Sequence, residues 1–183
     1  LREFKMNRKN ILNIHLYLAA FFLPFLLLMP FTGVSYLLGE KGAKVSSVQF
    51  SVDDVPPSQE SERTEWIHNQ FKANNITFDW EYIKPNQNDL ILRPSSRDHY
   101  IVSVQDNKTD FIKIEPNLLL KLIELHKGHG PKLFKNLEIT AGIALLLITI
   151  SGIFLSFYSR SLKKKFLLPL AIGSIVMLLT ILI

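Results

Sequence analysis

The sequence predicts a membrane protein with three transmembrane α-helices and one α+β domain inserted between the first and the second. We assign the spans to residues 11–39, 136–159 and 166–183. The first and third contain no Asp, Glu, Lys or Arg, and the second contains only Glu138. A helix rises about 1.5 Å per residue, so each stretch can cross a hydrocarbon core of ~30 Å. Residues 40–135 are polar instead, with acids and bases mixed.

Composition excludes several classes of protein. The chain of 183 residues is 48% hydrophobic, has a net charge of +5 and has no cysteine. Without cysteine there are no disulfides, thiolate metal ligands or cysteine nucleophiles. The basic residues cluster beside the apolar runs and form no stripe with interleaved aromatics, so we expect the lipid bilayer rather than nucleic acid as a partner. No Ser-His-Asp arrangement or phosphate-binding glycine loop is present, which disfavours hydrolysis and nucleotide chemistry.

The first span resembles a signal peptide only superficially. Residues 1–10 carry Arg2, Lys5, Arg8 and Lys9 ahead of the apolar run. That run, 11–39, is far longer than the ~7–15 residue apolar core of a signal peptide. We therefore expect it to be retained as a transmembrane helix behind a cytoplasmic segment 1–10.

Alternation and turn signals divide residues 40–135 into strand, helix and a meander of strands. We expect a strand over 48–52 and a helix over 58–73, capped by Ser58. Phe78, Trp80 and Tyr82 alternate with acids, which predicts a strand whose aromatic face packs in the core. Further strands are expected at 90–92, 100–104 and 111–114, followed by a helix that Pro116-Asn117 opens.

Charge sets the predicted orientation. Residues 160–165 contain four basic side chains, as in the short loops that stay in the cytoplasm. With residues 1–10 on the same side, the domain at 40–135 and the C-terminus would lie outside. The topology is consistent with all three spans.

Three histidines border the spans and are the candidate site residues. His15 lies near the inner edge of the first span, and His126 and His129 precede the second. Ionisable residues at membrane depth indicate function, and imidazoles suit the axial positions of a b-type haem. Because the two locations are expected at opposite bilayer faces, ~30 Å apart, one chain cannot supply both ligands to one iron. A haem at His15 would need a partner subunit.

Each histidine also has a purely structural explanation. His15 would hydrogen-bond to a lipid headgroup or a backbone carbonyl, and His126 would end its helix while the following glycines turn the chain. The spacing His126-x-x-His129 is helical and can direct both rings to one side, but Gly128 and Gly130 disfavour a continued helix. A zinc site is not expected, because too few further ligands are available.

Short motifs around the spans resemble those of the bacterial PepSY-associated transmembrane family. The matching residues are His15 followed by Thr32-Gly33, Leu125-His126 with Gly130, and Ser151-Gly152. This family includes iron-regulated membrane proteins and ferric-siderophore reductases of the inner membrane. The resemblance implies a PepSY-like periplasmic domain over 40–135 and haem b held by His15, His126 or His129.

The implied function is iron acquisition or haem-linked electron transfer across the inner membrane. Larger members of the family have four or more spans, whereas three are predicted here, so a homo-oligomer or a partner membrane subunit is expected. The alternative is non-enzymatic: a membrane-anchored PepSY module that binds or regulates a partner protein. The colour of the purified protein separates the two.

Overall fold

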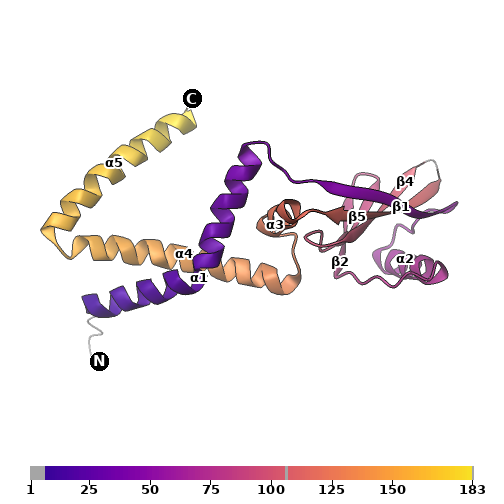
Figure 1. The fold of residues 1–183 in the computed structure, drawn as a ribbon, viewed down its shortest axis with the longest axis horizontal. Coiled ribbons are helices and arrows are strands. Elements are labelled where there is room, and N and C mark those ends of the chain that lie inside the picture. Colours follow the sequence, from indigo (N-terminus) through magenta and orange to yellow (C-terminus); the bar gives the residue numbers. More distant parts are fainter. Residues whose placement is uncertain (1–6, 106, 183) are drawn as a thin grey trace. The chain divides into compact units, whose positions relative to one another are not determined.

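The computed structural model describes residues 7–105 and 107–182, and the chain forms two compact units (Figure 1). One unit contains the described residues up to Leu26 together with those from Thr140 onward, and the other is Leu27–Ile139. Arg2 and Lys5, and most of the predicted cytoplasmic segment 1–10, lie outside the described residues.

Three helices are long and apolar enough to cross a membrane: α1 (Arg8–Leu37), α4 (Lys132–Phe157) and α5 (Arg160–Leu182). In the first unit, α1 contacts α4 where Phe22 packs with Ala141 and Ala144, all three of which are buried. The two alanines let the bulky ring approach the facing helix closely. Most other large apolar side chains of these helices are exposed, as lipid-facing residues would be.

Residues 160–165 do not form the basic loop that the sequence predicted. Its residues form the first turns of α5, and only Tyr158 and Ser159 separate α4 from α5. Ser159 explains the early start, because its hydroxyl accepts a hydrogen bond from Leu162 N at 3.4 Å and its carbonyl accepts one from Lys163 N at 2.9 Å. These contacts satisfy amide groups at a helix N-terminus.

The second unit is built on an antiparallel sheet of five strands in the order β1-β5-β4-β3-β2. The strands are β1 (Lys44–Val52), β2 (Tyr82–Asn86), β3 (Asp89–Arg93), β4 (His99–Gln105) and β5 (Lys108–Pro116). Strands β2 to β5 form a meander, and β1 pairs with β5. The strand, helix and meander order was predicted correctly from the sequence.

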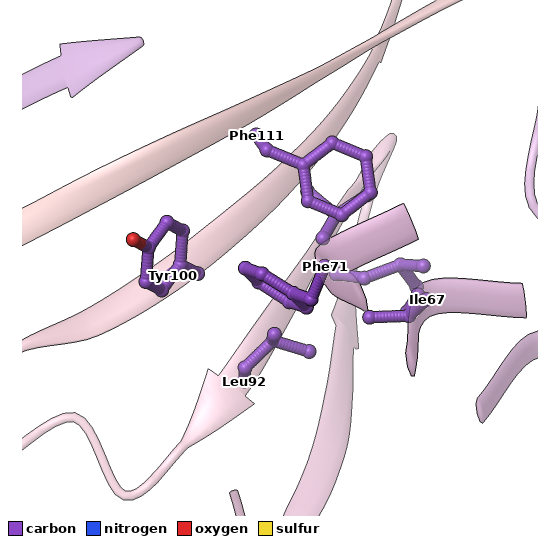
Figure 2. Close-up of a cluster of buried hydrophobic side chains, with 7 residues drawn as sticks. Ile67, Phe71, Leu92, Tyr100 and Phe111 are labelled. Carbon is purple, nitrogen blue, oxygen red and sulfur yellow. The ribbon is translucent and has the colours of Figure 1, made fainter. Parts of the chain in front are cut away.

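Helix α2 (Glu60–Ala73) covers one face of this sheet and encloses the core. Figure 2 shows Phe71 among side chains from the sheet, beside Ile67 of its own helix. The Phe71 ring centroid lies 4.8 Å from that of Tyr100 and 5.4 Å from that of Phe111, both edge-to-face. Such pairs add to the stabilisation from burying the rings.

Two local predictions in this unit are wrong. The helix starts at Glu60 behind Gln59, with no side-chain cap, so Ser58 does not cap it. The strand predicted at 78–82 starts only at Tyr82, because its partner β3 ends at Arg93 and Pro94 has no N–H to continue the ladder. Phe78 and Trp80 still pack against the core, as their alternation predicted.

Helix α3 (Leu118–His126) lies on the opposite face of the sheet and leads to α4. Asn117 caps it, with Oδ1 accepting from Leu120 N at 2.9 Å, which confirms the predicted start. After α3, Gly128 has φ 70°, a value that few residues other than glycine adopt easily. This turn directs the chain toward α4.

Candidate functional site

His15 is held by two groups on α4, within the first unit. Its Nδ1 lies 2.9 Å from Ser151 Oγ and 3.1 Å from the carbonyl oxygen of Ile148. The Ser151 hydroxyl itself donates to Ile148 O at 2.9 Å. A carbonyl oxygen only accepts, so the neutral ring carries its proton on Nδ1 and keeps a lone pair on Nε2.

His126 is held in the same manner by a hydroxyl of α1, within the second unit. Its Nδ1 lies 2.6 Å from Thr32 Oγ1, and Thr32 donates its own proton to Leu28 O at 2.8 Å. Because that proton is already used, the threonine oxygen accepts from Nδ1–H of His126. Thr32 is only 1% exposed, and Nε2 of His126 again keeps its lone pair.

The two arrangements share a glycine next to the hydroxyl residue. A Cβ atom added at Gly33 would lie 3.6 Å from Cε1 of His126, and one added at Gly152 would lie 3.6 Å from Cε1 of His15. The atom Cε1 lies between Nδ1 and Nε2, so each glycine lies beside the ring edge that carries both nitrogens. A Cβ atom at 3.6 Å would make an ordinary van der Waals contact with that edge.

Sequence reasoning identified these residues but not their pairing. His15 and Thr32-Gly33 both lie on α1 but do not pair with each other. His15 pairs with Ser151 of α4, and His126 of α3 pairs with Thr32. Helical geometry explains this, because residues far apart along one helix cannot meet. The contacts therefore join α1 to α4 in the first unit and α1 to α3 in the second.

A cavity of about 370 Å³ lies beside His126. Its lining comes from α1 and α3 and is mostly apolar: Thr32, Gly33, Tyr36, Leu37, Ile123, His126 and Lys127. Cavities that hold small molecules or cofactors are commonly apolar with a few polar groups, from ~300 Å³ upward. This part of the second unit has both properties.

His129 belongs to a different cluster. Its Nδ1 lies 2.8 Å from Glu124 Oε2, which also accepts from Ser95 Oγ and lies 3.1 Å from Arg93 Nη1. His126 and His129 do not share one helical face, because α3 ends at His126 and the turn at Gly128 follows. Their rings have separate hydrogen-bond partners.

Electrostatics make this cluster an ionic anchor. Burial alone would raise the pKa of Glu124, but hydrogen bonds from Lys127, Ser95 and His129 outweigh it and lower the pKa to about 2. For His129, burial outweighs the attraction of Glu124 and lowers the pKa below its usual 6.5. At pH 7 the carboxylate is therefore ionised, and a neutral imidazole donates to it.

The sequence analysis missed this cluster. Arg93 is the last residue of β3, Ser95 follows that strand, and Glu124 lies on α3. Ser95 N also donates to His129 O at 3.1 Å. The only signal was one acidic residue in a leucine-rich helix, which gives no indication of the partners. The cluster fastens the end of α3 to the sheet.

No protein-family model, curated protein or solved structure matches the chain. Within residues 7–105 and 107–182, no group of three or more His, Asp or Glu side chains could hold a metal ion.

Proposed function

We propose that the protein is a haem-binding electron-transfer protein of the bacterial inner membrane that serves iron acquisition, similar to the ferric-siderophore reductases of the PepSY-associated family. The observation that carries the proposal is that His15 and His126, at separate positions, have the same hydrogen-bond arrangement. Each neutral ring uses Nδ1 on a helix hydroxyl and leaves Nε2 with a lone pair.

This arrangement fits haem ligation. Histidines that bind metal nearly always donate their other N–H to a carbonyl, carboxylate or water, which fixes the tautomer and the ring orientation. Ser151 and Thr32 have this role here, and His15 and His126 would hold haem b through Nε2. Haem b would supply reversible transfer of single electrons.

The proposed topology places the sheet domain in the periplasm. Arg160 and the three lysines that follow it within the next five residues would face the cytoplasm at the start of α5, as the positive-inside tendency favours. The iron complex would then be reduced on the side of the sheet domain. The three apolar helices support membrane association.

A second subunit completes the ligand set. Bis-histidine ligation of an iron at His15 needs a second imidazole, which a symmetric copy of the chain supplies most simply. The extensive apolar surfaces of α4 and α5 are compatible with contacts to another copy as well as to lipid. His129 is a weaker ligand candidate, because Glu124 and Arg93 account for its position without a cofactor.

The deciding experiment is the absorbance spectrum of detergent-purified protein produced with ample haem. We expect a Soret band that shifts with dithionite, and His15→Ala and His126→Ala should each remove the haem at their own position. The matched control is His68→Ala, because His68 is an exposed residue of α2 in the sheet domain. This variant should keep the full spectrum.

The hydrogen-bond partners provide a sharper test. Thr32→Val removes the hydroxyl that accepts from Nδ1–H of His126 and keeps the histidine, so haem affinity there should fall by ~10–100-fold with a shifted Soret maximum. Ser151→Ala leaves Nδ1–H of His15 the carbonyl oxygen of Ile148 as an acceptor, so its effect on haem affinity should be smaller. A Soret band that survives both histidine substitutions would contradict the assigned ligands. Complete absence of haem would leave the membrane-anchored binding module as the surviving function.

A further inference from the structure

A second cavity in the second unit has a very different lining. It has a volume of about 370 Å³ and lies between α3 and the face of the sheet opposite α2. Ile91, Ile101 and Ile114 of the sheet and Leu120 of α3 form its apolar part. Charged groups surround this apolar part.

Positive charge predominates around the cavity. Lys41, Lys44, Arg93 and Lys127 line it, against the single carboxylate of Glu124. That carboxylate is already engaged by Arg93, at 3.1 Å, and by Lys127, at 2.8 Å. Among residues 7–105 and 107–182, no acidic side chain forms an ion pair with Lys41 or Lys44. Lys41 Nζ lies over the Tyr36 ring, 5.2 Å from its centroid, and no carboxylate among these residues neutralises either lysine, so both ammonium charges can attract an anion.

His99 adds a deep polar group to the same cavity. The residue is only 6% exposed, and its Nδ1 lies 2.8 Å from the carbonyl oxygen of Arg97. Since a carbonyl only accepts, Nδ1 carries the proton of the neutral ring. Nε2 is left for a ligand, and it becomes a donor to an anion when the ring is protonated.

A close backbone approach fixes the two lysines beside the cavity. At Gly42 an added Cβ would lie 2.5 Å from Leu120 N and 2.8 Å from Asn117 Oδ1, so only glycine fits against the start of α3. Its φ of 75° also favours glycine. Asn117 N donates to Ala43 O at 2.8 Å, which fastens the same segment. Lys41 and Lys44 flank this fastened point.

We propose that this cavity binds a small amphipathic oxyanion, a carboxylate or phosphate carried on an apolar body. The oxyanion meets Lys41, Lys44 and His99, and the apolar body lies on the isoleucines. Hydrogen bonds to charged groups are stronger than neutral ones, and a partly enclosed site screens them less than open water does. His15, Thr32 and His126 take no part, so the site does not depend on haem.

Two sources carry this chemistry: a membrane phospholipid and a soluble organic anion. The test is isothermal titration calorimetry on the full chain in a neutral detergent, with three probes. Dihexanoyl phosphatidic acid represents the lipid, citrate represents a soluble polycarboxylate, and hexyl phosphate has the shared features alone. Hexanol and dihexanoyl phosphatidylcholine control for partition into the micelle.

We expect hexyl phosphate to bind saturably, one per chain, and hexanol not to. Lys44→Gln should weaken binding about tenfold or more, which is the loss of one hydrogen bond to a charged group. His99→Gln should weaken binding by a similar factor only at a pH low enough to protonate the ring, where Nε2–H donates to the anion. Lys108→Gln is the matched control, because Lys108 is an exposed lysine of β5 outside the lining of the cavity. It should bind as the wild type does.

The comparison of probes identifies the source. Tighter binding of phosphatidic acid than of hexyl phosphate assigns the site to a lipid, and equal or tighter binding of hexyl phosphate assigns it to a soluble organic anion. Tighter binding of citrate than of both, since citrate has no apolar body, would overturn the proposal. Lys44→Gln changes an exposed side chain, so its effect is readable even if His99→Gln destabilises the fold. Absence of saturable heat with all three anionic probes, or equal binding by Lys44→Gln and wild type, would overturn the proposal.

Discussion

Replacing Glu124 by glutamine should destabilise the sheet domain in a manner that depends on pH. The carboxylate is only 12% exposed and lies 3.1 Å from Arg93 Nη1, which is 7% exposed. Glutamine keeps the shape and can still hydrogen-bond to Ser95, but it removes the negative charge. A buried guanidinium is then left without its counter-ion, a situation that is strongly destabilising.

The magnitude follows from the pKa of Glu124. Its fall from 4.5 to about 2 corresponds to about 3 kcal/mol of stabilisation of the ionised form, at ~1.36 kcal/mol per pKa unit. Because the folded pKa lies below the unfolded one, this stabilisation is fully present above pH 4.5 and is lost as the pH falls toward 2. Glu124→Gln should thus cost about 3 kcal/mol at pH 7 and much less near pH 2.5.

Tryptophan fluorescence during urea unfolding in detergent measures this effect in the right part of the molecule. The chain has two tryptophans, Trp66 and Trp80, and both pack on the core of the sheet domain. Glu115→Gln is the control, since Glu115 pairs with Lys113 at an exposed position and should have little effect. A Glu124→Gln deficit of the same size at pH 7 and pH 2.5, or no deficit at either, would refute the reasoning.

Three further predictions concern the core, pH and topology. Phe71→Ala should lower the unfolding free energy by ~3–5 kcal/mol, because Phe71 is only 2% exposed. Trp80→Ala should lower it by less, because Trp80 is only partly buried. The fluorescence of the remaining tryptophans measures both effects. The unfolding free energy should fall as the pH decreases below 6.5, because burial lowers the pKa of His99 and the unfolded chain takes up the proton first. His99→Gln should reduce the dependence of the unfolding free energy on pH in urea titrations. An unchanged dependence on pH would contradict this prediction. A reporter active only in the periplasm should be active when fused after Asn107 and silent at Lys164, and the reverse pattern would invert the proposed orientation.

Patterns that arise from neighbouring residues were predictable. The three long apolar helices follow from uninterrupted hydrophobic runs, and β3, β4 and β5 follow from alternation between turns. The helix after Asn117 follows from its cap. Each of these depends on residues a few positions apart, which the sequence displays directly.

Errors occurred where alternation or charge was used to assign the local structure. Phe78 and Trp80 alternate like a strand, but the ladder needs hydrogen bonds from a neighbour, and Pro94 ends that neighbour. Residues 160–165 were assigned to a loop from their charge, whereas Ser159 starts a helix there. Charge and alternation indicate which side chains are exposed to solvent. The same pattern of exposure can occur in a helix, a strand or an extended segment, so it does not distinguish them.

The sequence by itself determined which residues lie in or close to the apolar helices and could form a site: His15, His126, Thr32-Gly33 and Ser151-Gly152. Only the tertiary structure decided that His15 meets Ser151 and that His126 meets Thr32. It also brought Arg93, Ser95 and His129 to Glu124. The physical reason is that hydrogen bonds and ion pairs act over about 3 Å between atoms. The chain separates all of these partners except His129 and Glu124 by 29 to 136 residues, so their pairing depends on how helices and strands pack.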